Sequence, residues 1–297
     1  MTTEAEHRRA LVLLALCGLF WSTAGVLIKL VSWHPGAIWS MRSLIAAAGL
    51  YAIRRPSMRG ITRAEIAAAI ALAATTGLFV VANKLTTAAN AILIQYSAPI
   101  WVALLGNWFL GERATRLDWL TIIVVLVGIA LFFVDQLTID YMAGNIVALA
   151  AGVAFAAGAL TMRRAALTPI DPLRPLLLGN ILGAVAGAPF LFATPGPDLR
   201  GWGALVALGL VQQAAAYLCY AGAIRHAEAL DVMLVPVIEP ILSPVWVAIA
   251  FGERPGPWAL VGGVIVVGAV TARALLSRRS TVERELLDPV KAARQKR

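Results

Sequence analysis

Apolar segments long enough to cross a membrane recur along almost the whole chain, separated by short polar breaks. A helix needs about 17–25 mostly apolar residues to cross a hydrocarbon layer roughly 30 Å thick. The chain is 60% hydrophobic and only 14% charged, whereas soluble domains are about 45–50% apolar and about 25% charged. A soluble helical bundle would need polar outer faces, which these segments lack. The sequence therefore predicts an all-α integral membrane protein.

The breaks contain the Gly, Pro and polar residues that are typical of loops, as in Trp33-His34-Pro35-Gly36. The first apolar run contains Trp21 and Lys29 and has no small-residue cleavage pattern, which favours a permanent span over a signal peptide. The sequence thus predicts ten transmembrane helices. They lie near residues 11–31, 36–53, 64–83, 88–110, 117–134, 145–163, 173–193, 202–224, 229–251 and 257–276.

The distribution of basic residues predicts the orientation of these helices. If the N-terminus is cytoplasmic and the helices alternate, most of the 25 Lys and Arg residues fall on the cytoplasmic side. This is the arrangement that the positive-inside rule describes, so we expect both termini in the cytoplasm. The net charge of +9 reflects this bias and the basic tail 277–297. We therefore expect contact with lipid headgroups rather than with nucleic acid. The five exceptions are Lys29, Arg42, Lys84, Arg200 and Arg254.

One phrase occurs twice, as YSAPIWVALLGNWFLGER at 96–113 and as VIEPILSPVWVAIAFGER at 237–254. The alignment needs no gap and places Pro99 on Pro240. The chain therefore divides into two halves of five helices, 8–136 and 141–276, and an odd number of helices inverts the second half. Inverted repeats are a common plan of secondary transporters. The alternative is a duplicated membrane protein that transports nothing.

Two five-helix halves, each with a fourth helix that contains Pro and ends in Gly-Glu-Arg, resemble the EamA-type drug/metabolite transporter superfamily. Glu239-Pro240 followed by Gly252-Glu253, together with Arg42 in the second helix, carries this resemblance over residues 8–276. Gly179 departs from it, because a basic residue is expected opposite Arg42. The aromatic-rich first half is most similar to bacterial exporters of aromatic amino acids. The resemblance implies a multi-pass protein of the bacterial inner membrane.

In the resembled family, the first, third, fourth, sixth, eighth and ninth helices build a central cavity. Aromatic side chains suit apolar cargo there, and polar groups within membrane helices are often functional. For a single aromatic side chain, packing against lipid or another helix is an equal alternative. The predicted substrate-binding residues are Phe20, Trp21, Phe79, Gln95, Tyr96, Trp101, Phe155, Tyr217 and Glu239.

The sequence also predicts roles for Glu239 and for the two aligned prolines. Glu239 can take up a proton or bind a substrate ammonium group, or it can hold backbone groups that Pro240 frees. Pro99 and Pro240 are predicted hinges for the fourth and ninth helices. Arg42 is either a structural anchor to a helix end or part of a site.

Other function classes lack their characteristic residues in this sequence. Three scattered histidines, His7, His34 and His226, form no HExxH motif, and no paired-cysteine motif is present. We therefore expect no catalytic residues, no metal and no cofactor. A membrane enzyme and a non-transporting scaffold are less favoured alternatives. The sequence predicts a secondary transporter that exports small amphipathic metabolites, with aromatic and other apolar amino acids as the first candidates and other metabolites or drugs as the alternative. A monomer is compatible with this function.

Overall fold

The computed structural model describes residues 4–86, 88–132, 134, 141–251 and 257–287. Helices are the only regular secondary structure in these residues. The second Gly-Glu-Arg, at 252–254, lies outside the described residues, and so do residues 288–297 of the predicted tail. The side chains of Lys29 and Lys84, two of the exceptions to the positive-inside distribution, are not described either.

The first half of the chain forms seven helices, several of them paired end to end. They are α1 (Glu4–Ser22), α2 (Ala24–Lys29), α3 (Pro35–Arg54), α4 (Arg63–Leu85), α5 (Ala88–Gln95), α6 (Ala98–Leu110) and α7 (Arg116–Phe132).

The second half mixes α-helices with short tighter and wider helical segments. They are α8 (Met142–Ala166), α9 (Leu173–Gly187), the 3-10 helix η1 (Ala188–Phe192), α10 (Leu199–Ala207), the π-helix η2 (Leu208–Ala215), α11 (Ala216–Ala223), α12 (Ala229–Leu234), the 3-10 helix η3 (Val235–Val237), α13 (Ile238–Phe251) and α14 (Pro257–Leu287).

Seven helical stretches of the described chain are long and apolar enough to cross a membrane. A shorter apolar stretch, Val261–Arg273, lies within α14. The prediction of an all-helical membrane protein is therefore confirmed. The seven stretches are Glu4–Ile28, Pro35–Arg54, Arg63–Ala82, Ala91–Leu110, Met142–Ala166, Leu173–Phe192 and Leu199–Ala223.

Small residues place α8 at the centre of the bundle. One face of this helix buries Ala148, Ala151 and Ala156, and α4, α5 and α6 pack against the helix. A Cβ added at Gly152 would lie only 3.0 Å from the carbonyl oxygen of Gln95. Small residues permit such close approach between membrane helices, where packing and not water exclusion drives association. The α4–α8 contact thus forms the middle of the fold.

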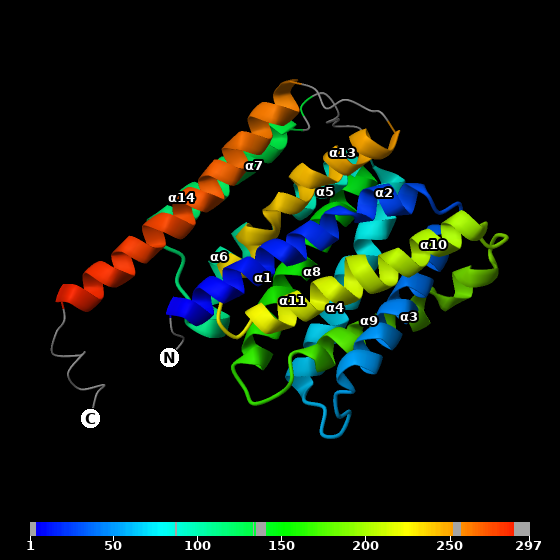
Figure 1. Cartoon of the computed structure of the whole chain (residues 1–297), viewed down its shortest axis with the longest axis horizontal. Helices are drawn as coiled ribbons and strands as arrows, with labels where there is room; N and C mark the ends of the chain where they lie inside the picture. Colours follow the sequence, from blue (N-terminus) through cyan, green and yellow to red (C-terminus); the bar gives the residue numbers. More distant parts are fainter. Residues whose placement is uncertain (1–3, 87, 133, 135–140, 252–256, 288–297) are drawn as a thin grey trace.

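The remaining helices surround this centre in pairs. In Figure 1, α14 runs alongside α7 at one side of the bundle, and the two helices pack together. Helix α3 packs against α9, and α1 packs against α11 and α13. The backbone of α14 continues to Leu287, past the predicted end of the tenth helix at 276. The segment between contains neither Gly nor Pro, so nothing in it terminates a helix.

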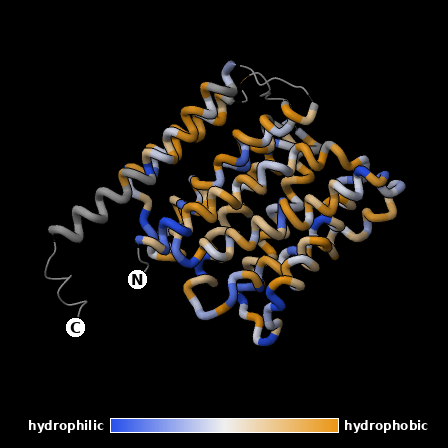
Figure 2. Tube along the Cα trace, in the orientation of Figure 1, coloured by the Kyte–Doolittle hydropathy of each residue, from blue (hydrophilic) through white to orange (hydrophobic). Residues whose placement is uncertain are grey.

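Large apolar side chains cover much of the outer surface. Trp108 is 81% exposed, Val264 74% and Ile249 73%. Figure 2 shows hydrophobic residues along the helices, with hydrophilic residues concentrated near the end of the bundle at which the N-terminus lies. A surface of this kind is stable against lipid and not against water. We call the end that contains His7, Glu112 and His226 the N-terminal end.

Candidate functional site

A cavity of about 120 Å³ lies among the central helices. Residues from α1, α2, α3, α4, α8, α11, α13 and η2 line it, together with the break between α5 and α6. This volume is below the roughly 300–1,000 Å³ that is typical of sites for drug-sized ligands. The cavity is therefore a small one. Its lining residues are Trp21, Ala24, Ile28, Arg42, Leu72, Thr75, Thr76, Phe79, Gln95, Tyr96, Phe155, Gly158, Ala159, Met162, Gln212, Gln213, Tyr217, Tyr220 and Glu239.

Aromatic rings form one wall of this cavity, with Trp21 at their centre. The Trp21 ring meets Phe155 edge to face, at a centroid distance of 6.2 Å and an interplanar angle of 67°. It meets Tyr217 at 6.4 Å and 83°, and Tyr220 at 6.2 Å and 38°. Such contacts hold the rings in defined orientations and offer flat apolar surface to a ligand.

A carboxylate faces the same cavity. The Tyr96 hydroxyl donates a hydrogen bond to Glu239 Oε2 at 2.9 Å, and it lies 3.5 Å from the carbonyl oxygen of Pro236. No hydrogen bond to Glu239 Oε1 occurs within the described residues, so one oxygen of the carboxylate has no protein partner there. The Tyr96 hydroxyl fixes the position of the other oxygen.

Several other buried polar atoms of the cavity have no hydrogen-bond partner among the described residues. Arg42 is 6% exposed, and its Nε makes no hydrogen bond in the described part of the chain. The same holds for Gln212 Oε1 and Gln213 Oε1, whereas Gln213 Nε2 donates to Asn180 Oδ1. Buried polar atoms are normally paired, and each unpaired one carries a free-energy cost of about 1–3 kcal/mol. These atoms can be paired by a ligand.

Breaks in the helices place these side chains in the cavity. Helix α5 ends at Gln95 and α6 begins at Ala98, so Tyr96 lies in the break. Pro99 follows in the first turn of α6, where its missing N–H removes no helical hydrogen bond. Glu239 is the second residue of α13, which directly follows the 3-10 segment η3. Pro240 follows Glu239 directly.

The π-helix η2 carries both glutamines of the cavity. A π-helical segment changes the direction in which the following side chains project and is frequent at functional sites. Here it lies in the stretch Leu199–Ala223, between α10 and α11. Both Gln212 and Gln213 are buried, at 7% and 3% exposure, and both line the cavity.

The structure brings most of the predicted substrate-binding residues together. Phe20 and Trp101 lie outside the cavity lining and pack, partly buried, against the hydrophobic core. A substrate-binding role for any of the nine stays a prediction, as do the hinge roles of Pro99 and Pro240. Those that line the one cavity are Trp21, Phe79, Gln95, Tyr96, Phe155, Tyr217 and Glu239.

Gln212, Gln213 and Tyr220 also line the cavity but were not among the predicted substrate-binding residues, and neither was Arg42, for which the sequence left a role in a site open. Each is a polar or aromatic residue within an apolar segment, and that was the available signal. For the two glutamines, the side of the helix on which the side chains lie was not predictable, because the π-helix changes the helical periodicity there.

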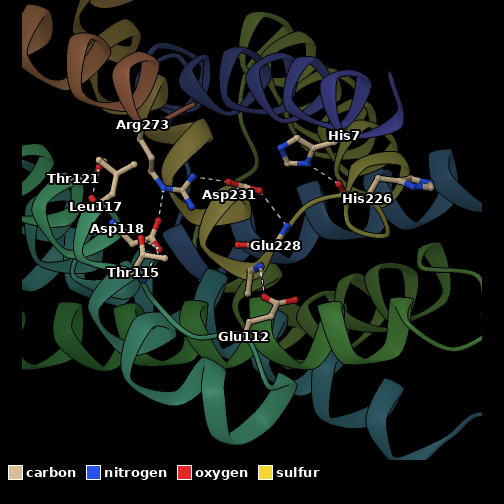
Figure 3. A network of polar contacts seen from close by, with 11 residues as sticks. His7, Glu112, Thr115, Leu117, Asp118, Thr121, His226, Glu228, Asp231 and Arg273 are labelled. Atoms are coloured by element: carbon tan, nitrogen blue, oxygen red, sulfur yellow. Dashed lines mark hydrogen bonds and ion pairs between the residues drawn. The ribbon is translucent and has the colours of Figure 1, made fainter. Parts of the chain in front are cut away.

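A second polar group lies at the N-terminal end of the bundle (Figure 3). Arg273 of α14 forms ion pairs with Asp118 of α7 at 2.7 Å and with Asp231 of α12 at 2.5 Å. The second oxygen of each aspartate accepts from backbone at the start of its own helix, Asp118 from Thr115 N at 2.7 Å and Asp231 from Glu228 N at 3.1 Å. We call Asp118, Asp231 and Arg273 the ion triad.

Glu112, from the first Gly-Glu-Arg, lies near this triad in Figure 3. Its Oε1 pairs with Arg163 of α8 at 3.0 Å, and its Oε2 accepts from the backbone N–H of Ala229 at 2.8 Å. Because Ala229 is the first residue of α12, its N–H has no acceptor within the helix, and Glu112 supplies one. The glutamate of this motif thus joins the end of α6 to α8 and α12.

The EamA-like transporter family model matches residues 8–134 and 142–272. The chain therefore belongs to the EamA-like transporter family. A transporter "YwfM" of Bacillus subtilis, described as uncharacterized, is 26% identical over 226 residues, which cover 73% of this chain and 75% of that protein. A solved crystal structure superimposes with a TM-score of 0.79 at 20% identity, covering 92% of this chain and 99% of that one, which shows the common fold.

Two further relatives are named as exporters. The "probable terminal-alkyne amino-acid exporter" of Streptantibioticus cattleyicolor is 28% identical over 255 residues, 80% of each chain. The "pseudopaline exporter CntI" of Pseudomonas aeruginosa is 28% identical over 188 residues, 62% of this chain and 65% of that protein. The family and these relatives show that the chain is a multi-pass membrane transporter of small molecules and not an enzyme.

Proposed function

We propose that the protein exports small zwitterionic metabolites, first of all aromatic and other apolar amino acids. The observation that carries this proposal is the presence of Arg42 and Glu239 in one cavity with an aromatic wall. The guanidinium binds the substrate carboxylate through a charge-assisted hydrogen bond. The free oxygen of Glu239 accepts from the substrate ammonium group, and the apolar side chain packs on the ring of Trp21.

Alternating access between two inverted five-helix repeats is part of this proposal. With the first half laid on the second, α1–α2 correspond to α8, α4 to α10–η2–α11, and α5–α6 to α12–η3–α13. The contact of α4 with α8 then corresponds to that of α1 with α11, and the contacts of α5 and α6 with α8 correspond to that of α1 with α13. In the contacts α3–α9 and α7–α14, each helix packs against its own counterpart in the other half. Ten helices in the halves 8–136 and 141–276 account for this pattern.

We further propose that the N-terminal end is cytoplasmic and that the protein lies in the bacterial inner membrane. Arg54, Arg163, Arg174 and Arg225 lie at helix ends or connections on the side that the positive-inside rule assigns to the cytoplasm. We also propose that the cargo resembles that of the bacterial aromatic amino-acid exporter YddG.

Counterflow in liposomes tests the proposed cargo. Purified protein is reconstituted with unlabelled phenylalanine inside, and uptake of labelled phenylalanine is measured against competitors. Phenethylamine lacks the carboxylate and 3-phenylpropionate lacks the ammonium group, so both should compete far less well than phenylalanine or leucine. Equal competition by either analogue would contradict the zwitterion site. Absence of counterflow for every neutral amino acid would refute the cargo.

The variant Glu239→Gln tests the carboxylate. The amide keeps an acceptor for the Tyr96 hydroxyl but removes the negative charge that the ammonium group needs. We expect counterflow of phenylalanine to fall at least tenfold, and its dependence on pH to flatten. An unchanged rate with an unchanged pH profile would assign Glu239 to the helix break alone.

A further inference from the structure

A second cavity, of about 450 Å³, opens at the N-terminal end of the bundle. It lies between the end of α3, the connection from α8 to α9, and the last turns of α11. It shares no lining residue with the central cavity, so transport of the proposed cargo does not account for it. Its lining residues are Arg54, Pro169, Asp171, Pro172, Leu173, Leu218, Ala221, Gly222 and Arg225.

Two exposed arginines stand at this cavity. Arg54 is the last residue of α3, and Arg225 follows the end of α11. Arg225 Nη2 donates to the carbonyl oxygen of Ile170 at 2.5 Å, which holds the guanidinium beside the cavity. Neither arginine forms an ion pair with a carboxylate of the described residues. Both therefore keep donors for an anion.

One carboxylate also lines the cavity. Asp171 Oδ1 accepts from the backbone N–H of Leu173 at 3.0 Å, at the start of α9. This position stabilises its negative charge through the helix N-terminus, independently of the two arginines. Two arginines against one aspartate leave the lining with a net positive charge.

One wall of the cavity is apolar. Leu218, Ala221 and Gly222 come from α11, within the stretch Leu199–Ala223 that is long enough to span a membrane. Leu218 precedes Arg225 by seven residues, roughly 10 Å along a helix. The cavity thus combines cationic groups at the helix ends with apolar surface toward the membrane interior. A free small anion needs only the first of these features, whereas a phospholipid needs both.

We propose that this cavity binds the headgroup phosphate of an anionic phospholipid from the leaflet at the N-terminal end. The phosphate lies between Arg54 and Arg225, and an acyl chain follows Leu218. Basic pockets between membrane helices bind anionic headgroups in this way. Because Leu218 and Ala221 neighbour Tyr217 and Tyr220 of the central cavity, a bound lipid steadies the part of α11 that carries two cavity residues.

Native mass spectrometry of the purified protein, exchanged against phosphatidylglycerol or phosphatidylcholine, tests the proposal. We expect retention of phosphatidylglycerol, and a loss of about fivefold in retention for each of Arg54→Gln and Arg225→Gln, since one basic residue near a membrane contributes about 1 kcal/mol. The matched control is Arg200→Gln, an exposed arginine at the start of α10, which should leave retention unchanged. A melting temperature equal to wild type in lipid-free detergent shows that the variants fold.

Three results would overturn the proposal. In the first, the double variant Arg54→Gln/Arg225→Gln retains phosphatidylglycerol as well as the wild type does. In the second, the wild type binds phosphatidylcholine as well as it binds phosphatidylglycerol. In the third, millimolar inorganic phosphate displaces the lipid completely, which would assign the arginines to a soluble anion. Each is distinguishable from a failure of the cargo proposal, because none depends on counterflow.

Discussion

The central cavity and the ion triad each bury one arginine to the same extent, but the two arginines differ in their partners. Arg273 and Arg42 are each 6% exposed. Arg273 has two carboxylate partners, whereas Arg42 lines a cavity and its Nε has no partner in the described residues. Burying a charge is costly unless it is paired. We infer that the triad is completed by folding and that the cavity is completed by its ligand.

The largest effect is expected at the triad. Arg273→Met leaves Asp118 and Asp231 buried, at 7% and 5% exposure, without their cation. Removal of one member of a buried ionic group costs about 3–5 kcal/mol. We expect a large fall in the melting temperature in detergent and poor recovery of folded protein.

The matched control removes all the charges of the triad together. Because no unpaired charge then remains, the triple variant Asp118→Asn/Asp231→Asn/Arg273→Met should regain much of the stability. A triple variant that is less stable than Arg273→Met would show that the hydrogen bonds of the aspartates to the helix starts dominate instead.

Arg42→Gln should separate stability from transport. Since no protein partner of Nε is lost, we expect an unchanged or raised melting temperature. Counterflow of phenylalanine should fall at least tenfold, because the substrate carboxylate loses its cation. Arg42→Lys restores the charge without the planar donor pair and should recover part of the activity. A lowered melting temperature with normal counterflow would make Arg42 the structural anchor that the sequence left open.

The sequence predicted the helical membrane class, and most of the residues that it predicted for a site line the cavity, because both depend on local signals. Long apolar runs define the helices, and aromatic residues such as Trp21 and Phe155 are rare enough within them to be recognised. The triad was not predicted, since Asp118 and Arg273 are 155 positions apart and no local pattern links them. The repeat in the sequence showed that Glu112 recurs but not what it binds.

A moderate effect is expected from Phe155→Ala, which removes one ring of the aromatic wall. An aromatic pair contributes about 0.5–1.5 kcal/mol beyond burial, so the KM for phenylalanine should rise a few-fold and that for leucine less. Trp101→Ala is the matched control, because Trp101 lies outside the cavity lining. An equal loss in both variants would show that Trp101 reaches the substrate in another access state.

The smallest effect is expected from Glu112→Gln at the edge of the triad. The side chains of Arg163 and Glu112 are 12% and 23% exposed, so water weakens their ion pair, and its loss should cost about 1 kcal/mol or less. The amide oxygen still accepts from Ala229 N, whereas Glu112→Leu leaves that N–H unpaired at a cost of about 1–3 kcal/mol. Melting curves in detergent should therefore rank the leucine variant below the glutamine variant. The reverse order would mean that the acceptor for Ala229 N does not stabilise the start of α12, since both variants lose the charge that pairs with Arg163.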